Sequence, residues 1–157
     1  MQLAVVSDCH GAWRDAVLRL KDLHLDGLVY LGDMVVDGER LAEELAVEEF
    51  WCVCGNCDLL CDYEQELVLE LDEIRILVFH GHTYGVKSSL LGLKYRALEL
   101  GCQCVLFGHS HVWCDMEEDG VRLCNPGSVG RPRDVGASVG ILEIDCGKMM
   151  SFTRLVI

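Results

Sequence analysis

The sequence predicts an α/β fold with a parallel sheet in its first half. Short apolar runs rich in strand-forming residues alternate there with segments of helical periodicity. Each apolar run ends in Gly, Asp, Asn or His, which is typical of a chain that leaves a strand for a loop. The chain has 157 residues, 51% of them hydrophobic, which is enough for one buried core. We therefore expect a single domain over residues 1–157.

The first half of the chain alternates strictly between strands and helices. Segment 13–23 places its apolar residues on one helical face, and a second helix is expected over 38–47 with Asp37 as its N-terminal cap. This order predicts parallel neighbours, because the chain crosses back over the sheet between successive strands. The three strands are the apolar runs LAVVS (3–7), GLVYLGD (27–33) and EEFWCVCGNCD (48–58).

The second half is richer in hairpins. Two hairpins are expected, with turns at Asp72-Glu73 and at Asp119-Gly120. Between them, a helix is expected over 88–101, with Ser88 as its cap and Gly101 as its stop. The hairpins cover 66–81 and 112–125, and further strands are expected over 102–111, 137–145 and 148–157.

Composition and charge exclude some classes of partner. The formal net charge of −13 should repel the phosphate backbone, so a nucleic-acid duplex is not expected as a partner. No apolar run approaches the roughly 18 residues of a membrane span. The N-terminal stretch lacks the pattern of a signal peptide, so we expect a cytoplasmic protein without membrane contact.

Ten cysteines occur in the chain, and in a cytoplasmic protein they should be free thiols. Several lie in apolar company, where cysteine acts as a small hydrophobic residue. The spacing Cys54-x-x-Cys57 could indicate zinc, but no second CxxC pair accompanies it, so structural zinc is not favoured. Cys9 and Cys57 flank candidate ligands and could make the protein sensitive to oxidation.

Polar residues gather where the predicted strands end. The carboxyl ends of parallel strands share one edge of a sheet, where ligands bind. Two carboxylates, four imidazoles and one amide are more ligands than one metal ion needs, and they suit Mn, Fe, Zn or Ni rather than calcium. His24, in a helical stretch, is interpreted as an ordinary surface residue. The candidate ligands are Asp8, His10, Asp33, Asn56, His80, His109 and His111.

Five ordered motifs carry a resemblance to a known family. They are SDCHG, GNCD, HGHTYG, GHSH and NPGSVGRPR, spread over roughly residues 4–133. The chain resembles the calcineurin-like metallophosphoesterase superfamily and, within it, the small YfcE-type phosphodiesterases. The resemblance implies a four-layer α/β/β/α sandwich, with two mixed β-sheets flanked by helices. The pattern of strands and helices is compatible with this architecture but does not by itself predict two stacked sheets.

The same resemblance implies a site with two divalent metal ions. The preferred ion is Mn²⁺, with Ni²⁺, Fe²⁺, Zn²⁺ and Mg²⁺ as alternatives. A hydroxide bridging the ions would attack a small phosphodiester, with nucleotides as one class of substrate. The implied ligands are Asp8, His10 and His111 for one ion, Asn56, His80 and His109 for the other, and Asp33 for both.

Catalytic roles are expected for Asp33, for Asn56 and for His82. Asn56 could donate to a phosphate oxygen as well as bind metal. Many family members have a histidine directly after this asparagine, which protonates the leaving group, but this chain has Cys57 there. His82 is the nearest spare imidazole and could substitute, although a structural role is also open. Asp58 is expected to orient the turn.

Other interpretations stay open. Arg131 and Arg133 could meet a substituent of the substrate phosphate or pair with surface carboxylates. NPGS (125–128) reads as a structural turn. A phosphomonoesterase is an alternative activity. A non-catalytic interaction module like the retromer subunit of this fold is another, but the intact ligand set argues against it. Related small proteins of this fold commonly associate, so a homo-oligomer is one expectation.

Overall fold

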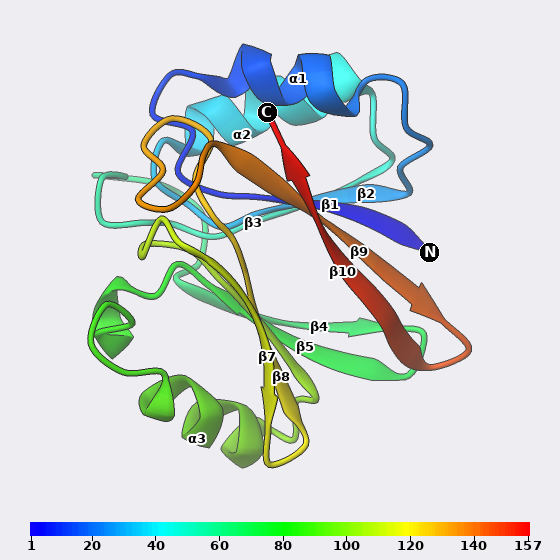
Figure 1. The fold of residues 1–157 in the computed structure, drawn as a ribbon, viewed down its shortest axis with the longest axis vertical. Coiled ribbons are helices and arrows are strands. Elements are labelled where there is room, and N and C mark those ends of the chain that lie inside the picture. Colours follow the sequence, from blue (N-terminus) through cyan, green and yellow to red (C-terminus); the bar gives the residue numbers. More distant parts are fainter.

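The computed structural model describes residues 1–157, except for the side chains of Met149 and Met150. Strands and helices alternate in the first half and hairpins follow (Figure 1). The elements are β1 (Gln2–Val6), α1 (Trp13–Leu20), β2 (Gly27–Tyr30), α2 (Val35–Leu45), β3 (Glu49–Cys52), β4 (Glu66–Leu71), β5 (Ile74–Phe79), the 3₁₀ helix η1 (His82–Tyr84), α3 (Leu91–Leu100), β6 (Cys104–Phe107), β7 (Trp113–Glu118), β8 (Val121–Pro126), β9 (Ser138–Asp145) and β10 (Lys148–Val156).

The strands form two mixed sheets of five strands each. The first has the order β10-β9-β1-β2-β3 and the second has the order β4-β5-β6-β8-β7. Strands β1, β2 and β3 are parallel, as predicted, and so are β5, β6 and β8. The two predicted hairpins are confirmed as the antiparallel pairs β4–β5 and β7–β8. Strands β9 and β10 extend the first sheet as a further antiparallel pair.

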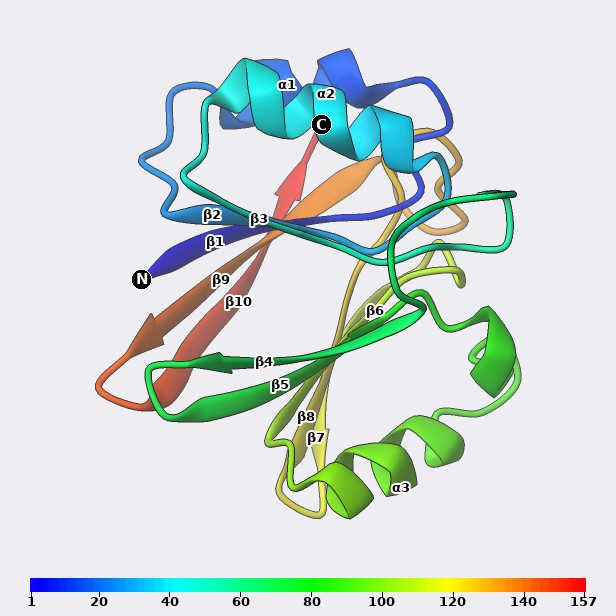
Figure 2. The same cartoon turned by 180° about the vertical axis from the view of Figure 1, so that it is seen from behind.

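The α-helices cover the outer faces of the two sheets. Helices α1 and α2 lie over the first sheet and α3 lies over the second, as Figure 1 and Figure 2 show from opposite sides. The layers are therefore helix, sheet, sheet, helix, which confirms the expected four-layer sandwich. No helix among the described residues combines the length and the apolar character needed to cross a membrane.

The central strands are apolar throughout because both of their faces are buried. Successive side chains of a strand point to opposite faces. In β1, Leu3 and Val5 therefore pack between the two sheets, whereas Ala4 and Val6 pack with the residues of α1 and α2. The same alternation in β5 separates side chains that face the first sheet from those that face α3.

The expectation that Asp37 caps α2 is wrong. The helix already begins at Val35, so Asp37 lies in its first turn and accepts a hydrogen bond from the backbone N of Gly11 (2.6 Å). The first helical amides are bound instead by Asp58, whose Oδ1 accepts from the backbone N of Met34 (2.7 Å) and of Val35 (2.8 Å). A carboxylate from a distant loop thus binds these helical amides, and local sequence does not reveal it.

Ser88 does not cap α3 either. Its backbone N donates to the carbonyl of Gly85 (2.9 Å) in a turn that precedes the helix. The helix begins at Leu91, whose backbone N donates to Oγ of Ser89 (3.2 Å). The predicted stop is confirmed, because Gly101 follows the last helical residue with φ of 66°.

Replacing Gly38 of α2 by alanine should destabilise the protein, although alanine usually favours a helix. A Cβ at Gly38 would lie 2.5 Å from Cγ of Tyr30. The Tyr30 ring is fully buried and its hydroxyl donates to the backbone O of Asp33 (2.9 Å), so it cannot retreat. We expect Gly38→Ala to lower the free energy of unfolding in urea by about 1–3 kcal/mol.

Gly92→Ala is the matched control in α3. A Cβ at Gly92 would meet nothing nearer than Cδ1 of Tyr84 at 3.6 Å, which is ordinary van der Waals contact. This substitution should raise the free energy of unfolding by up to about 1 kcal/mol. A shift of both variants in the same direction would contradict the close packing of α2 on Tyr30.

Candidate metal centre

The candidate ligands lie at one edge of the molecule, where strands of both sheets end. The parallel strands of each sheet direct their carboxyl ends to the same edge, and the loops that leave them meet at the left of Figure 1. These loops carry Asp8 and His10 after β1, Asp33 after β2, Asn56 after β3, His80 and His82 after β5, and His109 and His111 after β6.

The backbone is strained at five of these positions. All five have a φ between 45° and 63°, in the left-handed region that residues other than glycine rarely adopt. Each such residue costs on the order of 1–3 kcal/mol, and such residues cluster at functional sites. The five residues are Asp8, His10, Asp33, His109 and His111.

The two oxygens of the Asp8 carboxylate have different surroundings. Oδ2 accepts hydrogen bonds from Oγ of Ser7 (2.5 Å) and from the backbone N of His109 (3.1 Å). Oδ1 is buried and has no hydrogen-bond partner among the described residues. Nε2 of His111 lies 3.0 Å from Oδ1. A buried carboxylate oxygen without a donor is suited to a cation.

Two of the imidazoles are fixed through one nitrogen, which leaves the other nitrogen available. Nδ1 of His80 lies 2.7 Å from the carbonyl of Leu31, and Nδ1 of His111 lies 2.6 Å from the carbonyl of Arg131. A carbonyl only accepts, so Nδ1 carries the proton in both rings. In the neutral form of either ring, Nε2 then has a free lone pair, as in metal-binding histidines.

Donor atoms converge in a first group around Asp8. One donor atom from each residue of this group lies within 4.8 Å of every other. Nε2 of His10 is buried without a hydrogen-bond partner, 3.9 Å from Oδ1 of Asp8 and 3.8 Å from Oδ2 of Asp33. The group comprises Asp8, His10, Asp33 and His111.

A second group of donor atoms converges around Nε2 of His80. This nitrogen lies 3.2 Å from Nδ1 of His109 and 3.4 Å from Oδ1 of Asp33. Asp33 thus belongs to both groups, since its Oδ2 faces His10 in the first group. Imidazole nitrogens and carboxylate oxygens suit Mn, Fe, Zn and Ni, so both donor sets fit divalent metal ions.

Electrostatics keep Asp8, His10 and His109 in a form that can bind metal, whereas they favour the protonated form of His111. Burial raises the pKa of Asp8, but the contacts with His111 and His80 outweigh burial and lower this pKa overall. The contact with Asp8 raises the pKa of His111, so a metal ion bound there would displace a proton. Burial lowers the pKa of His10 and lowers that of His109 to about 4, so both rings are neutral and can donate a lone pair.

Asn56 lies at the exposed rim of the site, between two residues that contact Asp33. A Cβ at Gly55 would collide with the Asp33 carboxylate, so only glycine permits this approach. The backbone N of Cys57 donates to Oδ1 of Asp33 (2.9 Å). The Asn56 amide itself donates to Sγ of Cys57 (3.4 Å). Burial and the neighbouring Asp33 carboxylate raise the pKa of Cys57 to about 11.

His82 lies beside the second group. Its ring centroid is 5.5 Å from that of His80 and 6.2 Å from that of His109. Its Nδ1 is buried without a hydrogen-bond partner among the described residues. Burial and the neighbouring His80 side chain lower the pKa of His82. His24, by contrast, is exposed, which confirms its interpretation as a surface residue, but it follows α1 and does not lie in a helix as expected.

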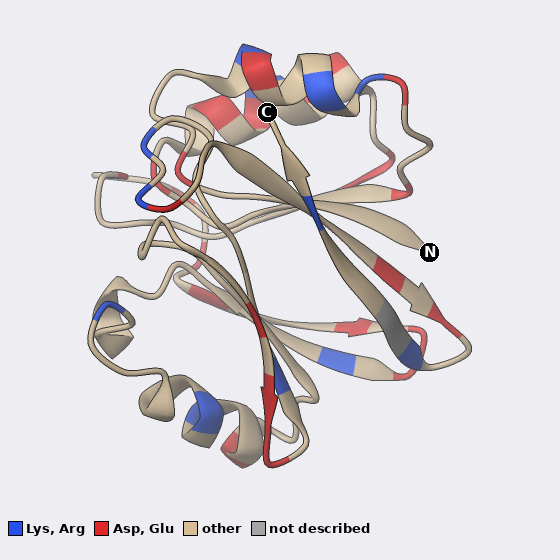
Figure 3. Ribbon diagram, in the orientation of Figure 1, with Lys and Arg blue, Asp and Glu red and all other residues tan. Residues whose placement is uncertain are grey.

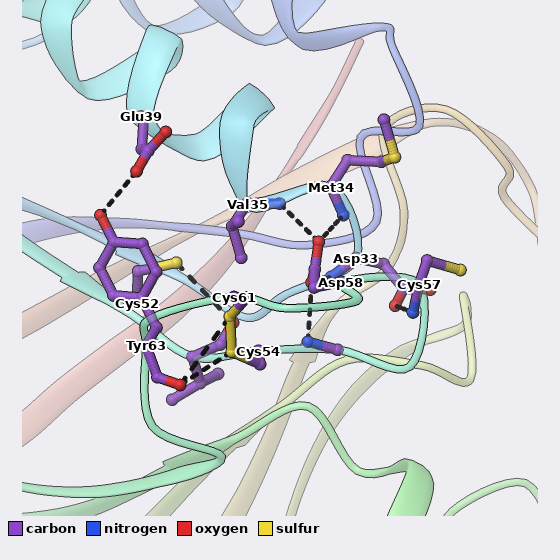
Figure 4. Close-up of a disulfide and its surroundings, with 12 residues drawn as sticks. Asp33, Met34, Val35, Glu39, Cys52, Cys54, Cys57, Asp58, Cys61 and Tyr63 are labelled. Atoms are coloured by element: carbon purple, nitrogen blue, oxygen red, sulfur yellow. Dashed lines mark hydrogen bonds between the residues drawn. A yellow bond between two sulfur atoms is a disulfide. The ribbon is translucent and has the colours of Figure 1, made fainter.

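Asp58 organises the loops around Asp33, which confirms the expectation that it orients the turn. Its carboxylate is central in Figure 4 and accepts four hydrogen bonds from backbone amides. Besides the two amides at the start of α2, Oδ2 accepts from the backbone N of Asp33 and from that of Gly55, both at 2.8 Å. One side chain therefore fixes the loops that follow β2 and β3.

The expectation that all ten cysteines are thiols is wrong. Cys54 and Cys61 form a disulfide, and eight cysteines are free (Figure 4). The loop between them turns back at Asn56–Asp58, which brings the two Cα atoms within 6.5 Å. The expectation rested on the cellular compartment and did not consider this geometry. Cys57, which the CxxC spacing would pair with Cys54, is free and exposed.

Comparisons with known proteins give a consistent result. The family model described as the calcineurin-like phosphoesterase superfamily domain matches residues 1–147. The chain is 36% identical to the probable metallophosphoesterase YsnB of Bacillus subtilis, with 85% of this chain and 78% of the relative covered. It is 28% identical to the phosphodiesterase YfcE of Escherichia coli, with 92% of this chain and 89% of the relative covered.

Solved structures share the architecture. A predicted phosphoesterase from Streptococcus pneumoniae superposes with a TM-score of 0.81 at 27% identity, covering 99% of this chain and 88% of that one. Vps29 of Entamoeba histolytica, in complex with zinc, superposes with a TM-score of 0.80 at 20% identity, covering 99% and 97%. At that identity, the likeness to Vps29 concerns the fold alone.

Removal of the Asp58 carboxylate should destabilise the protein strongly. Asp58→Ala leaves four backbone amides without their acceptor, three of them in residues that are at least partly buried. We expect a loss of about 2–4 kcal/mol in the free energy of unfolding by urea denaturation. Asp62→Ala, an exposed carboxylate of the same loop, is the control and should change stability by less than about 0.5 kcal/mol. Equal effects of the two variants would refute the role of Asp58.

Thiol titration of the denatured, unreduced protein tests the disulfide directly. Eight thiols should react, because ten cysteines are present and two are paired. The Cys61→Ser variant keeps nine cysteines and releases Cys54, so all of its cysteines should react. Ten reactive thiols in the unreduced wild-type protein would show that Cys54 and Cys61 are not joined.

Proposed function

This chain belongs to the calcineurin-like phosphoesterase superfamily, and from that premise we propose that it hydrolyses a small phosphodiester with the help of two divalent metal ions. The position of Asp33, whose two carboxylate oxygens face different groups of imidazoles, is the observation that carries the proposal. Nucleotides are one class of substrate that the proposal includes. We further infer that the whole chain acts as one domain.

The two groups of donor atoms support the ligand sets that we propose, to which Asn56 at the rim is added. Asp33 would contact both ions, which its distances of 3.8 Å to Nε2 of His10 and 3.4 Å to Nε2 of His80 support. Mn²⁺ is the preferred ion, although Fe²⁺, Zn²⁺ and Ni²⁺ suit the same donors. One ion would be held by Asp8, His10 and His111, and the other by Asn56, His80 and His109.

Bound divalent ions would lower the pKa of a water molecule and offset the negative charge of the phosphoryl group. The chain contributes fixed positions for the ligands. Oδ2 of Asp8 and Nδ1 of His80 are held by hydrogen bonds, so neither side chain needs to reorganise. The exposed amide of Asn56 would donate to a phosphate oxygen. His82 would be a weak proton donor to the leaving group, because one of its nitrogens is buried and its pKa is lowered.

The alternative of a non-catalytic interaction module draws on the fold shared with Vps29. A protein that only binds partner proteins does not need strained, buried side chains at the strand ends. In this chain five non-glycine residues keep the costly left-handed conformation there, and buried donor atoms lack hydrogen-bond partners. These observations favour the metal-dependent hydrolase.

The first test compares bis-p-nitrophenyl phosphate with p-nitrophenyl phosphate in the presence of Mn²⁺. The wild-type protein should hydrolyse the diester faster than the monoester, and a chelator should abolish both reactions. Asp33→Ala should reduce kcat/KM for the diester by roughly 10³-fold, about 4 kcal/mol of transition-state stabilisation, because both ions would lose a ligand.

Asp22→Ala is the control for this variant. Asp22 is exposed and follows α1, whose C-terminal end lies at the opposite edge of the sheet from the loops of the site. Asp22→Ala removes the same charge as Asp33→Ala and should leave kcat/KM for the diester within about twofold of the wild-type value. Metal binding without turnover of either ester, with any divalent ion, would favour the interaction module instead.

The leaving group should matter strongly, because Cys57 stands where many family members have a histidine. A thiol is a poor proton donor to an alkoxide. Aryl diesters, whose leaving groups need little protonation, should therefore react at least about 100-fold faster than alkyl diesters. Cys57→His should narrow this ratio, measured as kcat/KM across a series of leaving groups. Equal rates of the wild-type protein on aryl and alkyl diesters would contradict the argument.

A further inference from the structure

A cavity of about 460 Å³ opens beside the metal centre. It is formed by three segments: the turn between η1 and α3, the loop that carries His109 and His111, and the loop between β8 and β9. Its walls include Lys87, Leu90, Ser110, Val112 and Arg133. The volume lies within the range of small-molecule sites, which is about 300–1,000 Å³.

The cavity differs in charge from the rest of this acidic chain. Lys87 and Arg133 line it, and no carboxylate does. Four other cavities of the described molecule each have at least one Asp or Glu in their walls. In Figure 3, blue segments mark the turn between η1 and α3 and the loop between β8 and β9 at the same side of the molecule. A positive cavity in a chain of net charge −13 would select an anion.

Lys87 and Arg133 are also free to bind an anion. Among the described residues, neither forms an ion pair with a carboxylate, in contrast to Lys94, Arg122 and Arg154. The sequence left open whether Arg133 pairs with surface carboxylates. The structure answers that it does not, and both side chains are exposed to solvent.

The cavity adjoins the candidate ligands through the backbone. Ser110 lies between His109 and His111, and the backbone N of Arg133 donates to the carbonyl of His111 (2.9 Å). Val86, which also lines the cavity, packs against Gly81, the residue after His80: a Cβ added to Gly81 would lie 3.1 Å from Cγ1 of Val86. A molecule whose phosphorus lies at the metal centre could therefore extend into this cavity.

Part of the cavity wall is apolar. Val86 and Leu90 belong to the hydrophobic cluster between the second sheet and α3, where Cys114 also packs. Val112 adds further apolar surface. Apolar walls with two cations fit a group that has both an apolar body and a negative charge.

We propose that this cavity binds one substituent of the diester substrate, a group of nucleoside size that carries a second negative charge. Lys87 and Arg133 bind the second charge, and Val86, Leu90 and Val112 contact the apolar body. The proposal rests on the proposed function, since the reacting phosphate is placed at the metal centre. Lys87 and Arg133 are then specificity-determining residues. A second phosphate is the negatively charged group that they would prefer.

Two esters that differ by one phosphate test this proposal. The p-nitrophenyl ester of thymidine 5′-phosphate is compared with the same ester that carries a further phosphate at its 3′ oxygen. For the wild-type protein, kcat/KM should be at least about tenfold higher on the phosphorylated ester. Lys87→Gln and Arg133→Gln should each reduce this preference, mainly through KM, and the double variant should abolish it.

Arg40→Gln is the control, because it removes an exposed cation of α2 that lines none of the cavities compared above. It should keep the wild-type preference. Turnover of both esters with no preference, or a preference that Arg133→Gln and Arg40→Gln leave equally intact, would overturn the proposal.

A binding measurement separates this inference from the proposed function. Thymidine 3′,5′-bisphosphate is titrated into the Zn²⁺-loaded protein while the backbone amide resonances are followed by NMR. Shifts at Lys87, Ser110 and Val112 that disappear in Arg133→Gln would support the cavity even if no ester were hydrolysed. Shifts confined to other surfaces, or no shifts, would overturn it even if bis-p-nitrophenyl phosphate were hydrolysed.

Discussion

The two sheets are joined at one edge by hydrogen bonds between candidate ligands and the backbone of the opposite sheet. Oδ2 of Asp8, after β1, accepts from the backbone N of His109, after β6. Nδ1 of His80, after β5, lies 2.7 Å from the carbonyl of Leu31, after β2. These contacts link residues 101 and 49 positions apart in the chain. The site therefore exists only when both sheets are packed, so folding and ligand placement are coupled.

The same edge concentrates the features that oppose stability. Five of the candidate ligands have positive φ, and buried atoms such as Oδ1 of Asp8 and Nε2 of His10 lack hydrogen-bond partners among the described residues. A core built only for stability would avoid both. Surrounding hydrogen bonds hold the strained loops, above all the four that Asp58 accepts. Metal ions bound by the unpartnered donor atoms would offset part of this cost.

The sequence predicted the order of strands and helices because period and turn signals are local. The strand over Leu3–Ser7 and the turn at Asp119-Gly120 are examples. It also placed the candidate ligands at strand ends, which the structure brings together at one edge. It did not predict that Asp58 would accept hydrogen bonds from the first amides of α2, because this contact joins two different loops. Nor did it predict the pairing of Cys54 with Cys61, which depends on the path of the loop between them. The expectation of two stacked sheets came from the family resemblance, since apolar strands alone do not reveal whether a helix or a second sheet covers them.

We have proposed that Asp33 binds two metal ions at the joined edges of the sheets. Anomalous diffraction from crystals grown in Mn²⁺, recorded above the manganese absorption edge, would locate these ions. Two peaks are expected on either side of the Asp33 carboxylate, one beside His10 and His111 and the other beside His80 and His109. No peak at this edge, with Nε2 of His111 still 3.0 Å from Oδ1 of Asp8, would contradict the proposal.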